Sequence, residues 1–360
     1  MHLFFHGQNG QGGAPNFDLW KDTFLEPFNL IGINMQYQDG DNSKDTRGKV
    51  LAAREAIAQT LADYKIIPGH GVICSFSGGG GPHGLFTERL AHERGPNWPF
   101  AHSAMYSSNY WTVITLKMTP MSWFGEVGGK EWGMAQPKLG QSAVQRITEL
   151  KMNAAKGGPC DIYFASDKDG GHGIRRDEVF LSAKQFRRST LAYAPVLYEA
   201  DFLEPELASL VKTANALALG QPVTAVDKIL NDKKATAPVL EKAAAIKAFL
   251  TARIEDILKI AKELESDPVL MTYYGPLYAR QLAGTPQAKQ LQESMAAADK
   301  NPQRAKVMAL FMKFKLLDVF VKYAYPPAES SLPMLQDLQK SAGDNSALGQ
   351  MAAGLIKLRN

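Results

Sequence analysis

Short apolar runs alternate with longer amphipathic segments through the first half of the chain. The apolar runs have the length of strands and lie at His2–Phe5, Leu30–Met35, Val72–Ser75, Phe100–Tyr106, Pro120–Phe124 and Asp161–Ala165. Between them, apolar residues recur at helical spacing, which predicts helices at Thr46–Tyr64, Pro82–Arg94, Ser142–Ala155 and Arg176–Ala192. Strands that alternate with helices in this way predict an α/β fold with a doubly wound, mostly parallel sheet.

The second half of the chain has a helical pattern throughout. A long amphipathic run follows Pro238 and stops before Asp267-Pro268, and Asn301-Pro302 has the residue types that open a further helix. Shorter helices are predicted around Glu206–Leu219 and Gln287–Ala298. Composition changes at the same place, since 25 of the 31 glycines precede residue 201 and all seven histidines lie within the first 172 residues. We therefore predict an α/β domain over residues 1–194 and an all-helical domain over residues 195–360.

Composition and charge indicate which classes of partner and which compartments the sequence favours. Hydrophobic residues make up 45% of the 360 residues and charged residues 21%, enough apolar material for a sizeable core. A net charge of +4 without a dense Lys/Arg cluster argues against a nucleic-acid partner. No run reaches the ~18 apolar residues of a membrane span, so no membrane span is expected. No signal peptide is visible, so we expect a soluble protein of unknown compartment, export included if a leader was removed.

One stretch at the end of a predicted strand has the pattern of a catalytic turn. The apolar run Val72–Cys74 is followed by Ser75-Phe76-Ser77-Gly78-Gly79 and then by a predicted helix. Strand, sharp turn and helix form the context of a nucleophile elbow, whose usual pattern is Gly-x-Ser-x-Gly. Here serine replaces the first glycine and is still small enough for a tight turn. Ser77 is therefore the candidate nucleophile.

Two other interpretations of the glycine run are open. Glycine-rich turns after strands often serve only close packing. Glycine amides at the start of a helix also attract phosphate groups. However, the chain has no Gly-x-x-x-x-Gly-Lys-Ser/Thr and no Gly-x-Gly-x-x-Gly followed by its acid.

Further polar motifs follow the ends of other predicted strands. His6-Gly7 follows the first strand and Gly125-Glu126 ends the fifth. His172 lies within Gly170-Gly171-His172-Gly173, after the last strand. Carboxyl ends of parallel strands meet at one edge of a sheet, and ligands bind at that edge in doubly wound folds. The pattern therefore predicts that Ser77 and these motifs share one site.

With these motifs, about residues 1–192 resemble the α/β-hydrolase superfamily, in the form of a minimal core. The matches are the His6-Gly7 turn, the Ser77 elbow, an acid after the next-to-last strand and a histidine after the last one. Their order along the chain, serine, acid and histidine, is that of the superfamily. The resemblance implies a serine nucleophile and acyl transfer, usually the hydrolysis of an ester or an amide.

The resemblance also implies a role for single residues. His172 would take the proton of Ser77, because a serine hydroxyl is a poor nucleophile and imidazole titrates near neutral pH. The amide of Gly78, next to the nucleophile, and the amide of Gln8, after His6-Gly7, would form the oxyanion hole. His6 itself is expected to have a structural part in its turn.

The acid that should orient His172 departs from the family pattern. Members usually have Gly-x-x-Asp after this strand, whereas the corresponding position here is Gly128. Glu126 lies nearest the strand end and is the first choice, with Glu131 as the alternative. Two acids just before His172, Asp167 and Asp169, are further candidates that the sequence leaves open.

The sequence as a whole favours a serine hydrolase of the carboxylesterase type, with a small-molecule ester or acyl compound as substrate. No cofactor is implied, and no histidine spacing matches a metal site, so no metal is expected. A serine peptidase and a non-catalytic binding protein on the same fold are the alternatives. The helical domain is a candidate for a cap over the site, a homo-oligomer interface or a partner-binding surface.

Overall fold

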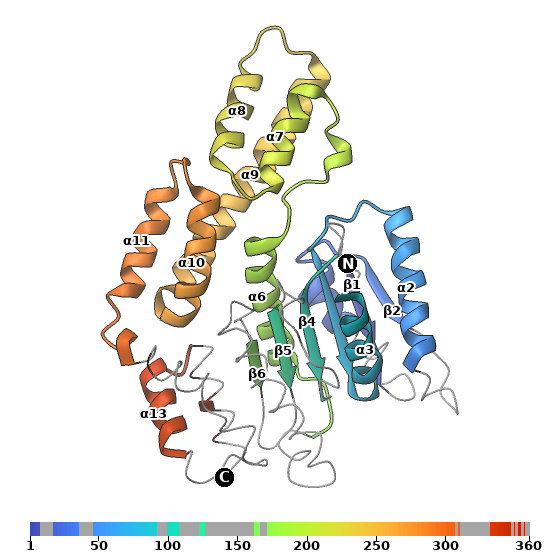
Figure 1. Ribbon diagram of the computed structural model, residues 1–360, viewed down its shortest axis with the longest axis vertical. Helices are drawn as coiled ribbons and strands as arrows, with labels where there is room; N and C mark the ends of the chain where they lie inside the picture. The colour runs from blue at the N-terminus through green and yellow to red at the C-terminus, as the bar shows by residue number, and fades with distance from the viewer. Residues whose placement is uncertain are drawn as a thin grey trace.

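The first half of the chain is built on a parallel sheet. The structure is a computed structural model that describes residues 1–7, 17–35, 46–91, 99–107, 122–126, 162–165, 171–306 and 332–346, with positions 309, 349, 352, 353 and 356. The described strands form one six-stranded sheet of order β2-β1-β3-β4-β5-β6, and every neighbouring pair is parallel. The bounds are β1 His2–Phe5, β2 Gly32–Met35, β3 Gly71–Phe76, β4 Phe100–Tyr106, β5 Ser122–Glu126 and β6 Ile162–Ala165. The predicted α/β class is confirmed, and all six carboxyl ends meet at one edge, where the arrowheads point in Figure 1.

Helices cover both faces of the sheet. Their bounds are α1 Phe17–Trp20, continued by a π-helix at Lys21–Leu25, α2 Thr46–Asp63, α3 Gly80–Ala91 and α6 Arg176–Tyr193. Neighbouring side chains of a strand point to opposite faces. The ring of Phe5 lies 5.9 Å from Phe86 of α3, whereas the ring of Phe4 lies 5.0 Å from Trp20 of α1. Because both faces are covered, β1, β3 and β4 are buried along their whole length.

The second half is helical in its described part. The helices are α7 Pro205–Asn215, α8 Gly220–Leu230, α9 Ala237–Glu263, α10 Pro268–Leu282, α11 Ala288–Asp299 and α13 Leu332–Ala342. The long helix predicted after Pro238 is confirmed as α9. The helix predicted over Glu206–Leu219 is too long, because α7 ends at Asn215 and α8 begins at Gly220. The predicted helices at Ser142–Ala155 and after Asn301-Pro302 lie largely or wholly outside the described residues.

Helix α10 was not predicted from the sequence, and it contains Gly275-Pro276, a dipeptide of low helix propensity. In the structure both residues lie inside α10. A Cβ at Gly275 would come within 3.2 Å of Met271 and Met295, so the glycine lets α10 and α11 approach closely. Tyr274, beside it, is fully buried. Tertiary packing therefore outweighs the low helix propensity of this dipeptide.

Helix α6 joins the two halves of the chain. One hydrophobic core lies against the face of the sheet that α1 and α6 cover and includes Phe186 of α6, and a second core, in the helices, includes Leu191 of the same helix. Arg253 of α9 is 6% exposed and donates hydrogen bonds to the carbonyls of Leu191 at 2.7 Å and Ala194 at 2.9 Å. Burial lowers the pKa of Arg253 to about 10, so it remains a cation at neutral pH. A cation suits the carboxyl end of a helix, where the carbonyls of α6 lack intrahelical partners.

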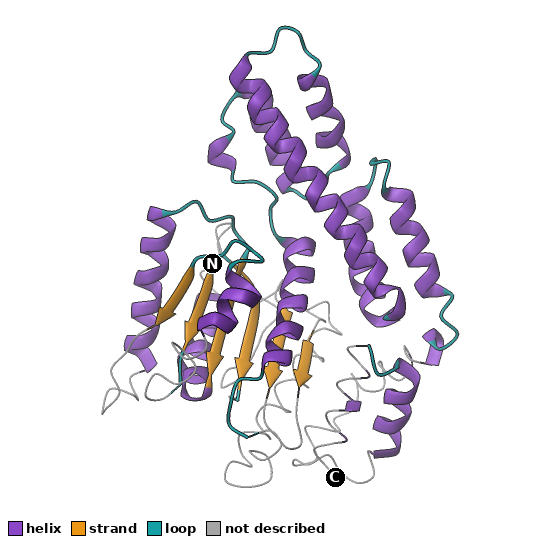
Figure 2. Cartoon of the chain, turned by 180° about the vertical axis from the view of Figure 1, so that it is seen from behind, coloured by secondary structure: helices purple, strands orange, loops and turns teal. Residues whose placement is uncertain are grey.

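The first helices after α6 extend away from the carboxyl edge of the sheet. In both views α7, α8 and the first part of α9 lie beyond the opposite edge, from which the strands start (Figures 1 and 2). These three helices therefore do not cover the carboxyl ends of the strands.

Candidate active site

The Ser77 turn has the strained geometry of a nucleophile elbow. Strand β3 ends at Phe76, a single 3-10 turn spans Ser77–Gly79, and α3 begins at Gly80. Ser77 has a φ of +51°, a left-handed conformation that is uncommon for residues other than glycine. Such strain costs about 1–3 kcal/mol and persists only where the surroundings impose it. The backbone therefore presents the Ser77 side chain at the tip of the turn, at the carboxyl edge.

The structure explains why the turn needs small residues at positions 75 and 79. A Cβ at Gly79 would lie 2.1 Å from the carbonyl oxygen of Phe5 and 2.7 Å from that of His6, so β1 passes directly against the turn. Ser75 replaces the usual first glycine and is fully buried. Its hydroxyl fits because it hydrogen-bonds Nδ1 of His83, on α3, at 2.8 Å.

The structure brings Ser77 and His172 together across 95 residues of sequence. Oγ of Ser77 lies 2.8 Å from Nε2 of His172, which is hydrogen-bonding distance. The imidazole also packs on the ring of Phe76, with 4.9 Å between ring centroids. His172 lies in the segment that leads from β6 into α6, and it is exposed. This is the arrangement that a serine nucleophile and its base need.

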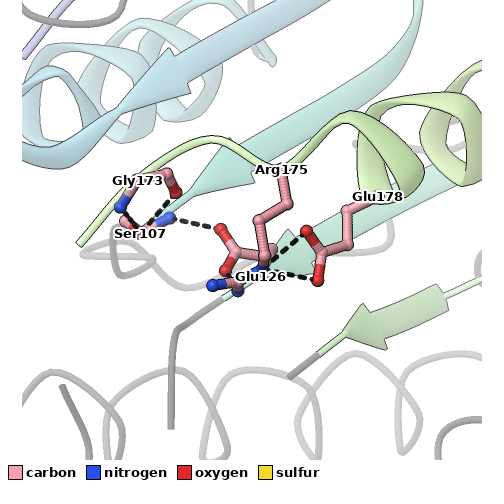
Figure 3. Close-up of polar contacts among 5 residues, drawn as sticks. All are labelled: Ser107, Glu126, Gly173, Arg175 and Glu178. Atoms are coloured by element: carbon pink, nitrogen blue, oxygen red, sulfur yellow. Dashed lines mark hydrogen bonds and ion pairs between the residues drawn. The ribbon is translucent and has the colours of Figure 1, made fainter. Parts of the chain in front are cut away.

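Glu126 is held at the same edge by contacts to two other segments. It is the last residue of β5 and is fully buried. Its Oε2 accepts a hydrogen bond from the amide of Ser107 at 3.0 Å, and Oε1 forms an ion pair with Arg175 (Figure 3). Nε of Arg175 also donates to both carboxylate oxygens of Glu178, at 2.8 and 2.7 Å. The direct bond from Glu126 to His172 that the sequence suggests stays a prediction, and the partners that the structure shows are Ser107 and Arg175.

The oxyanion-hole candidates are partly described. Gly78 lies in the turn before α3, where helix amides lack intrahelical acceptors and favour negative charge. Gln8 lies outside the described residues, but the segment that leads to it starts beside Gly79, as the contacts of Phe5 and His6 show. Nδ1 of His6 is 2.6 Å from the carbonyl of Gly7, a local contact within that turn. Three other acids considered from the sequence lie outside the described residues, namely Glu131, Asp167 and Asp169.

Sequence reasoning missed Ser107 and Arg175. Ser107 follows the end of β4 directly, so the rule that strand ends form the site would have selected it. Arg175 stands just before α6 and three residues before Glu178, with which it forms an i,i+3 ion pair. Neither residue type is itself a sign of catalysis, and for this reason neither position stood out.

A buried histidine, His83, hydrogen-bonds α3 to two strands of the sheet. His83 of α3 is fully buried, and its ring nitrogens lie 2.8 Å from the hydroxyls of Ser75 on β3 and Ser103 on β4. Burial, helped by the nearby His102, lowers the pKa of His83 to about 3. The ring is therefore neutral in the folded protein over the whole physiological range of pH.

We expect this histidine to make the sheet domain less stable in mild acid. An unfolded chain binds a proton on His83 near pH 6.5, whereas the folded one does so only near pH 3. Between these values unfolding takes up a proton at His83, so this residue alone should lower the free energy of unfolding by up to about 1.4 kcal/mol per pH unit as the pH drops. Burial also lowers the pKa of His2 and of His70, and these two residues add the same slope to the wild type and to a His83 variant. His83→Gln, which remains neutral, should flatten this dependence below pH 6.5.

Urea unfolding followed by tryptophan fluorescence at pH 8 to 5 would measure the effect. All five tryptophans lie within the first 132 residues, so the signal reports on the α/β half of the chain. Parallel pH profiles for the wild type and His83→Gln would contradict the prediction.

The described residues were also searched for metal sites, membrane-spanning helices and reactive thiols. Within them, no group of three or more His, Cys, Asp or Glu side chains could hold a metal ion. No helix in the described ranges is both long and apolar enough to cross a bilayer. Cys74 is a buried free thiol, and burial raises its pKa well above the usual value.

Comparison with known proteins gives no family or function for this chain. Searches against protein-family models, curated proteins and solved structures found no match for this chain.

Proposed function

We propose that this chain is a serine hydrolase that cleaves small carboxylic esters through an acyl-enzyme. The observation that carries the proposal is the 2.8 Å contact between Oγ of Ser77 and Nε2 of His172. It joins a serine in a strained strand-turn-helix elbow to an exposed imidazole, two features that close packing alone does not require.

The order of the site residues supports an α/β-hydrolase-like core. Ser77 follows β3, Glu126 ends the next-to-last strand β5, and His172 follows the last strand β6. The serine, acid and histidine thus have the superfamily's order both along the chain and across the sheet. A binding protein on the same fold would need neither the strained serine nor its contact with a base.

The proposed reaction uses each group in a defined step. Oγ of Ser77 attacks the ester carbonyl carbon while its proton passes to Nε2 of His172. The Gly78 amide stabilises the negative charge on the carbonyl oxygen, together with a second amide, proposed to be that of Gln8. The C–O bond then breaks, and the leaving alcohol takes the proton from His172.

Water completes the cycle. It attacks the acyl group on Ser77 and gives a proton to His172, and the carboxylic acid leaves as Ser77 recovers its hydrogen. We retain Glu126 as the acid of the site, because it is buried at the strand end beside the His172 segment. The chemistry needs no cofactor.

Covalent labelling tests the proposal directly. A fluorophosphonate probe should label the wild-type protein at a single serine, and Ser77→Ala should abolish the labelling. Ser209→Ala, an exposed serine on α7, serves as the matched control and should label like the wild type. A wild type that does not react, or a Ser77→Ala variant that reacts equally, would overturn the proposal in favour of a binding protein.

Substrate pairs separate esterase from peptidase. A chromogenic ester and the chromogenic amide of the same acyl group differ only in the leaving group, so the ratio of their kcat/KM values isolates that preference. We expect the ester to be cleaved faster. A higher kcat/KM for the amide would favour the peptidase alternative.

A further inference from the structure

The segment that bears His172 has little packing of its own. Glycines flank the histidine on both sides, and a Cβ built at Gly171 or at Gly173 would meet no atom of the described residues within 4 Å. His172 itself is exposed. Glycines leave a backbone flexible, so His172 keeps a fixed position only if other groups hold the backbone beside it.

Ser107 holds this backbone through both the amide and the carbonyl of Gly173. Its hydroxyl donates to the carbonyl of Gly173 at 2.8 Å and accepts from the amide of Gly173 at 3.1 Å (Figure 3). Gly173 is the residue next to His172, so these bonds fix the backbone within one residue of the base.

Ser107 is in turn held rigidly by the end of β5. It is 1% exposed, with a φ of +45°, the left-handed conformation that Ser77 also adopts. Its amide donates to the carbonyl oxygen of Glu126 at 2.8 Å and to Oε2 of the same residue at 3.0 Å. The carboxylate of Glu126 is thereby linked to the His172 segment through the backbone of Ser107.

A second connection runs from the same carboxylate to the other end of the segment. Oε1 of Glu126 pairs with the guanidinium of Arg175, three residues after His172 and just before α6. Arg175 is held from the far side by Glu178. One buried carboxylate therefore anchors the segment at Gly173, through Ser107, and at Arg175 directly.

We propose that Ser107 is a positioning residue, which places His172 against Ser77 by clamping Gly173. On this proposal Glu126 acts on the base through Ser107 and Arg175. The inference rests on the proposed function. It also accounts for a buried strand-end serine in a strained conformation, for which a purely structural role gives no reason.

Two variants separate the hydroxyl of Ser107 from its backbone strain. Ser107→Ala removes both bonds to Gly173 and keeps the strain, whereas Ser107→Gly removes the bonds and relieves the strain. If the clamp matters, both should lower kcat for a chromogenic ester by about 10- to 100-fold with KM little changed, since misplacing a catalytic group by about 1 Å can cost that much. Ser182→Ala is the matched control, because its buried hydroxyl bonds His102 away from this segment. It should leave kcat near the wild-type value.

Hydrogen exchange at one amide tests the clamp without any turnover. The Gly173 amide donates to Ser107, so its exchange should speed up at least about tenfold in Ser107→Ala and Ser107→Gly but not in Ser182→Ala. Wild-type kcat in both Ser107 variants, or unchanged Gly173 exchange, would overturn the clamp while leaving the hydrolase proposal intact. A wild type that fails to react with the fluorophosphonate would overturn the hydrolase proposal, and the positioning role with it.

Discussion

Ser77→Ala and His172→Ala should each slow ester hydrolysis by about 10⁴- to 10⁶-fold, and the double variant should be no slower than the slower single variant. In the proposed mechanism the hydroxyl and the imidazole act as one unit across their 2.8 Å contact, so removing either partner should remove the whole nucleophilic pathway. The remaining rate comes from substrate binding and from donors such as the Gly78 amide, which both substitutions leave in place.

Steady-state kinetics with a short-chain p-nitrophenyl ester would measure this non-additivity. Thermal unfolding of each variant checks that the fold is retained, which we expect because Ser77 is only partly buried and His172 is exposed. Ser209→Ala controls for the loss of a serine hydroxyl elsewhere. A double variant whose loss is the product of the two single losses would mean that the residues act independently, contrary to the proposed mechanism.

Gly79→Ala should lower both the stability of the protein and its hydrolytic rate. The new Cβ would lie 2.1 Å from the carbonyl oxygen of Phe5, which is backbone, so the turn or β1 must move. Overpacking of this kind costs about 1–3 kcal/mol, occasionally more. Because Gly79 is two residues from Ser77, the same movement displaces the nucleophile, and we expect kcat/KM to fall by about 100-fold.

The same glycine run contains a matched control. A Cβ at Gly81 would find Thr46 Oγ1 at 3.8 Å, an ordinary contact, and Gly81 lies inside α3. Gly81→Ala should therefore leave kcat/KM unchanged and alter stability by no more than about 1 kcal/mol, in the favourable direction. Equal effects of the two substitutions on kcat/KM and on the urea midpoint would show that the close approach of β1 does not constrain the elbow.

The strands and the elbow could be predicted because their signals are local. The apolar run before Ser75 and the small residues after Phe76 lie within one strand and one turn, and the structure has β3 and the 3-10 turn there. The low helix propensity of Gly275-Pro276 is local as well, yet both residues lie inside α10. The residues around that dipeptide do not indicate that α10 packs against Met295 of α11.

The candidate site also combines residues that the sequence could predict with contacts that it could not. Chain order and strand-end position were enough to select Ser77, His172 and Glu126 from the sequence. The strand-end rule could place Ser107 near the site, but not its bond to Glu126. Ser107 and Arg175 are 19 and 49 residues from Glu126 along the chain and reach it through the pairing of β4 with β5 and the start of α6.

Residue pattern alone thus predicted the α/β class with its helical second half, the turn at Ser77 and the two candidate catalytic residues, because periodicity and turn chemistry depend on neighbours a few positions apart. Folding in three dimensions settled how close Ser77 comes to His172, which backbone atoms exclude a side chain at Gly79, and which groups hold Glu126. These depend on strand order and register, which place β1 between β2 and β3 and join residues far apart in sequence. A hydrogen bond forms only over about 3 Å, and no spacing in the sequence encodes such a distance across 95 residues.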